Sequence, residues 1–539
     1  MTLLERFKLV FSIDYRSLAL FRICLGAIIL CDVIIRALNL TDFYTDDGVI
    51  KRSEWLTVLN EYQWSLYAIS GQPLFAAFLF LITAVAAISL MIGYRTRLST
   101  IVCWIMVLSL VNRNTYVNQG GDDLLCVLVF WAMFLPLGHL WSVDSIRRRA
   151  VTTQALEQPQ GSALDSDQSV RTASGAQSCF SVATVAVILQ VLYLYFFTAI
   201  LKTGDVWRES MDAAFYAVSL QHFATPIGSY MLNFPGFLKF GTYWVIVVEF
   251  VAPFLVLLPW FHLPARLIGL ACLYSLHVGF LLMLHIGLFP LIDFTALTLL
   301  IPAGLWIWFD KRKFLSSIGQ RLGSALNSLL ERLSRLLPQS SYRTHSDTGA
   351  LKLATQLLAG FFLVVVTYTN IAGIRDLKIT EPAWLSIPKD LTRLNQRWDM
   401  FAPYPMTYSL YPIAEGTLRD GTKVDLLTFE EAAPIREPPD YQYPVYGGYR
   451  WRKYLGRAHS MRSNTIRSGY GSYLCKRWNH SKRARDKQLA WSDLRFIRSH
   501  TNTTGEPKQQ QEVKTWEHWC FSEFAPENRN KVDQIEITR

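Results

Sequence analysis

The sequence has few charged residues for its length. Only 18% of its 539 residues are Asp, Glu, Lys or Arg, whereas soluble proteins carry about a quarter. It has no CxxC pair and no Cys/His spacing typical of a metal site, and no repeat at a fixed period. These features argue against an ordinary soluble protein, a zinc module and a repeat solenoid.

A cleavable secretory signal is also missing. The segment Met1–Asp14 is short and mildly basic, and it leads into a full-length apolar run without a small-residue cleavage site. We therefore expect the first apolar run to remain in the membrane as a start-transfer helix.

Apolar residues, in contrast, make up 51% of the chain. Nine of their runs are near the length of about 20 residues that a helix needs to cross a bilayer. The predicted spans are Ser17–Leu38, Pro73–Tyr94, Leu98–Arg113, Asp122–Trp141, Phe180–Lys202, Phe240–Pro259, Pro264–Ile286, Phe289–Phe309 and Leu351–Ile371. The third is the shortest and could be tilted or partly re-entrant.

The basic residues predict the sidedness of these spans, because cytoplasmic loops are enriched in Lys and Arg. They gather in the loops after spans two, four, six and eight: Arg95, Arg97, Arg147, Arg148, Arg149, Arg266, Lys311, Arg312, Lys313 and Arg321. The first loop is acidic instead. We therefore expect a cytoplasmic N-terminus and an extracytoplasmic C-terminal region. The net charge of +11 then reflects topology and contact with the lipid bilayer, and we expect no nucleic-acid partner.

Three segments lie outside the spans. Val151–Ser178 is rich in Ser, Gln, Ala and Thr, which predicts disorder. Phe314–Leu337 has leucines at helical spacing, which favours an amphipathic helix either on the inner leaflet or packed on the protein. Arg375–Arg539 combines turn signals with short alternating runs. Its two cysteines, Cys475 and Cys520, could form a disulfide, or Cys475 could simply be buried.

The expected fold is thus an all-α polytopic membrane bundle of about nine transmembrane helices followed by a small α+β extracytoplasmic domain. We divide the chain into a transmembrane core (1–310), a cytoplasmic amphipathic linker (311–350), a last transmembrane helix (351–374) and the C-terminal domain (375–539).

Ionisable residues inside spans are costly and mark candidate sites. In the first span, Asp32 and Arg36 are four residues apart and share a helix face with Arg22 nearby. An internal ion pair that locks helices together is the main interpretation for these residues.

Lys202 ends an apolar, aromatic helix, with Trp207 five residues later. It could extend to the outer interface. Alternatively, apolar surroundings covered by Trp207 would favour the neutral amine, which could act as a base.

Two further groups lie within spans. Glu249 is too short to reach the membrane surface and must pair, hydrogen-bond or stay protonated. His277 could be catalytic or a hydrogen-bonded structural group. We group Lys202, Glu249 and His277 as candidate catalytic residues.

Several of these residues fall into an ordered set of short motifs. They are Asp14–Arg22 followed by Asp32, Gly93–Arg97, Trp141–Asp144, Lys202 to Trp207, Glu249, His277, Ile286–Pro290 and Arg397–Pro403. Over roughly residues 10–310 this order resembles the vitamin K-dependent γ-carboxylase-like superfamily, whose bacterial members carry the HTTM (horizontally transferred transmembrane) domain. The last motif resembles the bacterial branch, which implies a bacterial inner membrane.

In the carboxylase, a lysine deprotonates reduced vitamin K, and the resulting base removes a glutamate γ-proton before carbon dioxide is added. The resemblance places Lys202 at that lysine and implies a reduced quinone as cofactor and a peptide or protein as substrate. The animal enzyme has a histidine before the fourth span, where this chain has Gly121.

Three functions therefore remain open. The first is a quinol-dependent membrane enzyme, carboxylase-like or related, that modifies an extracytoplasmic substrate with Lys202 as base. The second is a non-enzymatic maturation or export partner. The third, a transporter, lacks the inverted repeats typical of that class.

Overall fold

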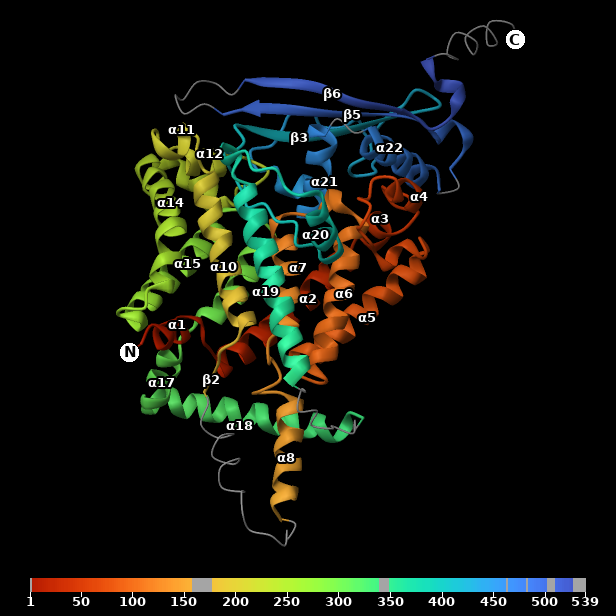
Figure 1. Ribbon diagram of the computed structural model, residues 1–539. Coiled ribbons are helices and arrows are strands. Elements are labelled where there is room, and N and C mark those ends of the chain that lie inside the picture. The colour runs from red at the N-terminus through yellow and green to blue at the C-terminus, as the bar shows by residue number, and fades with distance from the viewer. Residues whose placement is uncertain are drawn as a thin grey trace, which may run out of the picture.

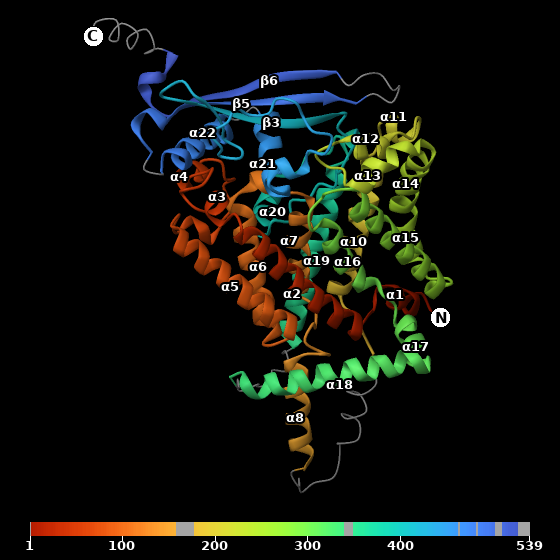
Figure 2. The same cartoon turned by 180° about the vertical axis from the view of Figure 1, so that it is seen from behind.

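The computed structural model describes residues 2–157, 177–338, 349–461, 464–480, 483–501 and 509–526. A bundle of helices forms the middle of the molecule, with a β-sheet across one end and the helix α18 (Lys313–Leu336) across the other in both views (Figure 1, Figure 2). We call these two regions the sheet end and the α18 end.

Six described helices are long and apolar enough to cross a membrane. They are α2 (Tyr15–Ala37), α5 (Pro73–Ile92), α10 (Val182–Leu201), α14 (Pro235–Leu257), α15 (His262–Met283) and α19 (Gly349–Ala372). Each coincides with a predicted span. The protein is thus a multi-pass helical bundle by composition, and a bent helix pair brings the candidates to seven.

The predicted count of nine stays a prediction. The third and fourth predicted spans correspond to α6 (Thr96–Arg113) and α7 (Gly120–Ala132). Helix α7 has only 13 residues, because Pro136 follows its last turn and disfavours helical backbone at the residue before it. Its predicted end at Trp141 was therefore wrong by nine residues.

The eighth predicted span is broken. Helix α16 (Phe289–Leu297) continues through a short 3₁₀ turn, and α17 (Ala303–Lys311) then leaves at an angle of 82°. Pro302 stands at the break and has no N–H to continue the helical ladder. Pro302 in the sequence would therefore have predicted the break in this span.

A buried arginine donates a hydrogen bond to a backbone carbonyl at the break in this helix pair. Arg266 donates from Nε to the carbonyl of Leu300 at 2.8 Å and from Nη1 to the carbonyl of Val10 at 2.8 Å. The sequence placed Arg266 in a cytoplasmic loop. That placement is corrected, because Arg266 is the fifth residue of α15 and is only 1% exposed; it also lies within the predicted span Pro264–Ile286.

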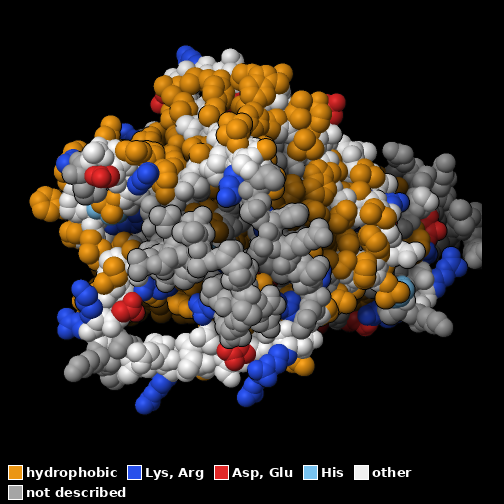
Figure 3. Space-filling model, turned by 60° about the horizontal axis from the view of Figure 1, so that its bottom comes forward, with side chains coloured by type: hydrophobic (Ala, Val, Ile, Leu, Met, Phe, Trp, Pro, Cys, Tyr) orange, Lys and Arg blue, Asp and Glu red, His pale blue; other side chains and the backbone are white. Residues whose placement is uncertain are grey.

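At the α18 end, α18 packs beside α8 (Val143–Glu157), and Arg147 donates to the carbonyl of Ser334 at 2.9 Å. Leu330 is buried, whereas Leu322 and Leu329, seven residues apart, are exposed on one stripe. Lys and Arg side chains project from the surface at the α18 end (Figure 3). Both alternatives for the amphipathic segment therefore keep support: it packs on the protein and also exposes an apolar stripe.

Most of the segment predicted to be disordered, residues 158–176, lies outside the described residues. On one side of it α8 extends to Glu157, and on the other side β2 (Ser178–Cys179) pairs antiparallel with β1 (Ile13–Asp14).

The C-terminal region is an α+β unit. Its strands are β3 (Tyr408–Leu418), β4 (Lys423–Asp425), β5 (Leu489–His500) and β6 (Gln510–Trp519), and its main helices are α20 (Ser386–Thr392), α21 (Tyr449–Ser460) and α22 (Asn464–Asn479). The sheet is antiparallel with the order β4-β3-β5-β6. A disulfide between Cys475 and Cys520, with a Cα–Cα distance of 5.4 Å, ties α22 to the residue after β6.

Short helices fill the connections at the sheet end. They are α3 (Leu40–Tyr44), α4 (Arg52–Leu56), α11 (Asp205–Arg208), α12 (Ala213–Ser219) and α13 (Pro226–Tyr230), whereas α1 (Leu3–Phe11) lies at the opposite end. One hydrophobic core runs from the bundle into the sheet and includes the buried Trp131, Trp398 and Trp478. The C-terminal unit is therefore packed onto the bundle, and its helix α21 lies on the side that faces the bundle (Figure 1).

Candidate functional site

The structure joins two of the three candidate catalytic residues directly. Lys202 caps the C-terminal end of α10, and Glu249 lies in the middle of α14. The Lys202 ammonium donates to both carboxylate oxygens of Glu249, at 2.6 and 2.5 Å. Lys202 is 3% exposed and Glu249 4%. The lysine therefore does not extend to an aqueous interface but forms a buried ion pair.

Trp207 covers this pair on one side. Its ring lies 4.5 Å from Lys202 Nζ, within the range of a cation–π contact. The indole N–H donates to the carbonyl of Phe401 at 2.9 Å, which fixes the ring in place. Phe401 belongs to the Arg397–Pro403 motif, so this motif supports the residue that covers Lys202.

His277 lies in a second group of protic side chains. The hydroxyl of Tyr195 donates to Asp293 Oδ1 at 3.1 Å and lies 3.0 Å from His277 Nε2. Tyr195 has one hydroxyl hydrogen, so with Asp293 as its acceptor the second contact requires a proton on His277 Nε2. The remaining ring nitrogen, Nδ1, is then a free acceptor.

Two atoms of this group lack hydrogen bonds. Within the described residues, His277 Nδ1 and Asp293 Oδ2 are buried and have no hydrogen-bond partner. Buried polar atoms are nearly always paired, and an unpaired one costs about 1–3 kcal/mol. Three rings surround the imidazole, with Phe280 at 5.6 Å, Phe289 at 5.8 Å and Phe294 at 6.2 Å. His277 is thus a polar side chain in aromatic surroundings.

The two groups are linked by α10, which contributes to both. Tyr195 and Lys202 are seven residues apart on and just after α10, which places them on one helix face. Four elements contribute the five side chains: α10 with its cap, α14, α15 and α16. We call Tyr195, Lys202, Glu249, His277 and Asp293 the proton-transfer cluster, because each of them can gain or lose a proton.

Asp32 and Arg36 belong to a different network. Arg36 Nε donates to Asp32 Oδ2 at 2.6 Å, and its Nη2 donates to Asp122 at the start of α7. Arg450 from α21 donates to Asp32 Oδ1 at 2.5 Å and to Asp122 Oδ1 at 3.1 Å. Two cations and two carboxylates therefore join the first span, α7 and the C-terminal domain.

Arg22 does not take part in this network. It lies fourteen residues before Arg36 on α2, which is about 21 Å along a helix. Its guanidinium donates to the carbonyls of Leu137, Leu140 and Trp141 at 3.2, 3.2 and 2.5 Å. It thus holds the irregular backbone that follows α7.

The first turn of α7 packs tightly at Gly121. A Cβ atom on Gly121 would lie 3.2 Å from Phe289 Cα and 3.3 Å from its Cβ. Gln119 donates from its side chain to the carbonyl of Ile286 at 3.0 Å. A histidine at position 121 would therefore have to displace the start of α16.

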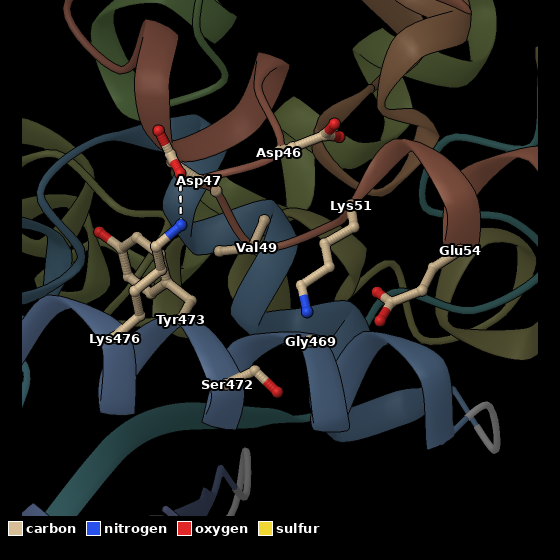
Figure 4. Close-up of a pocket in the computed structure, with 10 residues that line it drawn as sticks. Asp46, Asp47, Val49, Lys51, Glu54, Gly469, Ser472, Tyr473 and Lys476 are labelled. Atoms are coloured by element: carbon tan, nitrogen blue, oxygen red, sulfur yellow. Dashed lines mark hydrogen bonds and ion pairs between the residues drawn. The ribbon is translucent and has the colours of Figure 1, made fainter. Parts of the chain in front are cut away.

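One pocket of the described structure lies away from the proton-transfer cluster. It has a volume of about 140 Å³ and lies between the loop Asp46–Glu54 and α22, lined by Lys51, Ser472 and Tyr473 among others (Figure 4). An ion pair between Lys476 and Asp47 crosses its rim. No predicted site residue lines it. We take the buried cluster as the candidate site, because it combines all three predicted residues with His277 Nδ1, a buried atom that has no hydrogen-bond partner among the described residues.

Sequence reasoning missed Tyr195 and Asp293. Asp293 lies within a predicted span, and the rule that selected Glu249 would have selected it too. Tyr195 could have been found from its seven-residue spacing to Lys202. Arg450 had no comparable signal, because it lies in a basic stretch of a polar domain.

No curated protein and no solved structure matches the chain. A family model matches only part of it, and Lys202, Glu249 and His277 lie beyond the matched range. The match is to the HTTM domain over residues 11–160, so the part of the chain that contains α2, α5, α6 and α7 is similar to an HTTM domain.

Proposed function

We propose that this protein is a membrane enzyme that moves a proton within the bundle, with Lys202 as the base. The observation that carries the proposal is the proton-transfer cluster, in which Lys202 pairs with Glu249 beside Tyr195, His277 and Asp293. Ionisable groups are rare within spans and mark functional sites by default. The HTTM match supports the fold class but names no reaction.

The ion pair suggests how Lys202 can become a base. A lysine that already carries its proton cannot accept another. Transfer of that proton from Lys202 Nζ to Glu249 Oε2, 2.5 Å away, leaves a neutral amine beside a carboxylic acid. The ammonium–carboxylate pair is lower in free energy than the amine–carboxylic acid pair in water. A dry interior reduces this free-energy difference, because burial of charged groups is costly. The neutral amine then takes a proton from a ligand hydroxyl, while Glu249 retains the first proton.

Our proposal for the ligand of this cluster is a reduced quinone, on the chemistry of the side chains. When bound it would supply a weakly acidic aromatic hydroxyl and two electrons. His277 Nδ1 can accept a hydrogen bond from such a hydroxyl, and Phe280, Phe289 and Phe294 offer an aromatic environment. We do not extend the proposal to protein carboxylation, because Gly121 packs against Phe289 where a histidine would be needed.

The orientation is part of the proposal. Arg147 and α18 lie at one end, and the Cys475–Cys520 disulfide lies in the domain at the other. Basic loops face the cytoplasm, and disulfides persist in oxidising compartments. Both features favour a cytoplasmic α18 end and an extracytoplasmic sheet end, in a bacterial inner membrane.

The test compares Lys202→Arg with wild type in detergent. Arginine can keep the ion pair with Glu249, but it cannot serve as a base at neutral pH. Purified protein is mixed with menaquinol in air-saturated buffer, where dissolved oxygen is the oxidant that accepts the two electrons. Deprotonation of the quinol by the protein speeds this oxidation, which is followed by absorbance above the protein-free rate. Wild type should accelerate the reaction, and Lys202→Arg should melt at the wild-type temperature without accelerating it.

Arg436→Lys is the matched control, because this exposed arginine also binds carboxylates but lies outside the cluster. It should react like wild type. Quinol turnover by Lys202→Arg at the wild-type rate would reduce Lys202 to a positive anchor and refute the proposal. Absence of acceleration by wild type itself would refute the quinol as ligand.

A second candidate is a non-enzymatic maturation or export partner. The Arg450 network, which fixes the C-terminal domain to the bundle, favours it, since a rigid outward domain could present a surface to a peptide. The same menaquinol assay separates the two, because such a partner would bind its peptide but leave the quinol unchanged.

A further inference from the structure

A second charged cluster lies where α21 covers the start of α7. Arg450, Lys453 and Arg457 are spaced three and four residues apart, so they share one face of α21. This face packs on the short 3₁₀ turn Thr115–Val117 just before α7, and Arg457 donates to the carbonyl of Thr115. Arg393 reaches the same place and binds Asp123 at 3.1 Å.

The positive charges here outnumber the negative ones. Five cations face three carboxylates in this cluster: Arg36, Arg393, Arg450, Lys453 and Arg457 against Asp32, Asp122 and Asp123. Arg36 and Arg450 are neutralised by the first two acids, and Arg393 by Asp123. Lys453 and Arg457 remain without an ion pair among the described residues. Burying unpaired charge is costly, so the cluster favours an added anion.

Lys453 is the group most available to an anion. It is half-buried, and within the ranges that the structure describes it makes no hydrogen bond or ion pair. Burial, and then the neighbouring Arg457 and Arg452, lower the pKa of Lys453 to about 8. An anion beside Lys453 would oppose this shift.

Solvent reaches into the cluster. The side chain of Asp123 is 36% exposed although it belongs to the first turn of α7 beneath α21. Lys453 and Arg457 are also partly exposed, so solvent reaches this face of α21.

We propose that this face of α21 binds an oxyanion, phosphate or carboxylate, held by Lys453 and Arg457. Nothing in the quinol reaction requires this site, so the inference does not rest on the proposed function. Two sources can supply the anion: a small free anion, or the headgroup of a phospholipid at the outer membrane surface. Both sources carry the same charged group, and the proposal concerns that group.

The first experiment titrates sodium phosphate into purified protein in a neutral detergent at constant ionic strength and follows thermal unfolding. Phosphate that binds only the folded state raises the melting temperature. Lys453→Gln should weaken the apparent affinity about tenfold or more, since a charge-assisted hydrogen bond contributes that much. A parallel titration with phosphatidylglycerol in mixed micelles identifies a lipid source if it acts where free phosphate does not.

The matched control is Lys239→Gln, which removes an exposed lysine far along the chain from Lys453. It should respond to the anions as wild type does. Lys453→Gln should also raise the melting temperature without anion, because it removes an unpaired charge. Lys453→Arg should retain binding. The proposal is overturned if neither phosphate nor phosphatidylglycerol stabilises wild type, or if Lys453→Gln and Lys239→Gln respond alike.

Discussion

Replacing Glu249 with leucine removes the carboxylate that holds the Lys202 ammonium at 2.5 and 2.6 Å inside the bundle. The ammonium is then buried without a counter-charge. Removing one partner of such a pair costs about 3–5 kcal/mol. Lys202→Met leaves Glu249 buried alone, and we expect a loss of the same order. We therefore do not expect a Lys202→Ala variant to fold as stably as wild type.

The double variant Lys202→Met/Glu249→Leu should behave differently. An apolar pair of similar volume is often neutral or even stabilising in place of a buried ion pair. The two single losses should therefore not add, and the coupling energy should be about 3 kcal/mol or more. Unfolding by SDS in mixed micelles measures all four free energies.

Lys476→Met and Asp47→Ala supply the control cycle. These side chains form an ion pair but are about half exposed, and exposed pairs contribute about 1 kcal/mol or less. If the Lys202–Glu249 cycle gives a coupling as small as this control, the pair is solvated in the protein, and the argument from burial fails.

Four further outcomes follow from the structure. Asp32→Ala leaves Arg36 and Arg450 to share Asp122, and it should lower the free energy of unfolding by about 3–5 kcal/mol, measured by SDS unfolding; a wild-type melting temperature would mean that the network is solvated. The pair Cys475→Ser and Cys520→Ser opens a cross-link of 45 residues and should cost about 2–4 kcal/mol, visible as a lower melting temperature that reductant reproduces in wild type. The lowered pKa of Lys453, about 8, against about 10.4 unfolded, means that the unfolded chain holds the extra proton between these values, so stability should rise with pH through this window and Lys453→Gln should flatten the rise. A reporter active only outside the cytoplasm should be active after Arg539 and silent within Val151–Ser178, and the reverse pattern would contradict the orientation.

The spans were predictable because their signal is local. A run of apolar residues long enough to cross a bilayer depends on no distant contact, and six such runs coincide with helices of the described chain. The break at Pro302 and the early end of α7 before Pro136 were also visible in the sequence, but hydropathy averages over single prolines. Helix boundaries failed at these points for that reason.

The candidate site was predictable as a set of residues but not as a set of contacts. Lys202, Glu249 and His277 stood out because ionisable groups within spans are rare. Their partners depend on how helices pack: Glu249 is 47 residues from Lys202, and Asp293 is 98 from Tyr195. No periodicity within one helix reports such pairs. Arg450 is more than 300 residues from both Asp32 and Asp122 in the sequence, and only the tertiary fold brings these side chains together.

The chemistry of the two buried clusters separates a structural role from a reactive one. The network around Asp32 and Asp122 is held by Arg36 and Arg450, and a guanidinium keeps its charge at any physiological pH. Its ion pairs cannot relax by proton transfer, so they fix the C-terminal domain on the bundle. The proton-transfer cluster contains no arginine. Lysine and glutamate can neutralise each other across 2.5 Å, and His277 Nδ1 in the same cluster remains a free acceptor. A protein that needed only a lock at α10 and α14 could use arginine there, as it does at α2. Lysine in that position retains the one property that arginine lacks, the ability to become neutral, and this difference is why we assign reactivity to Lys202.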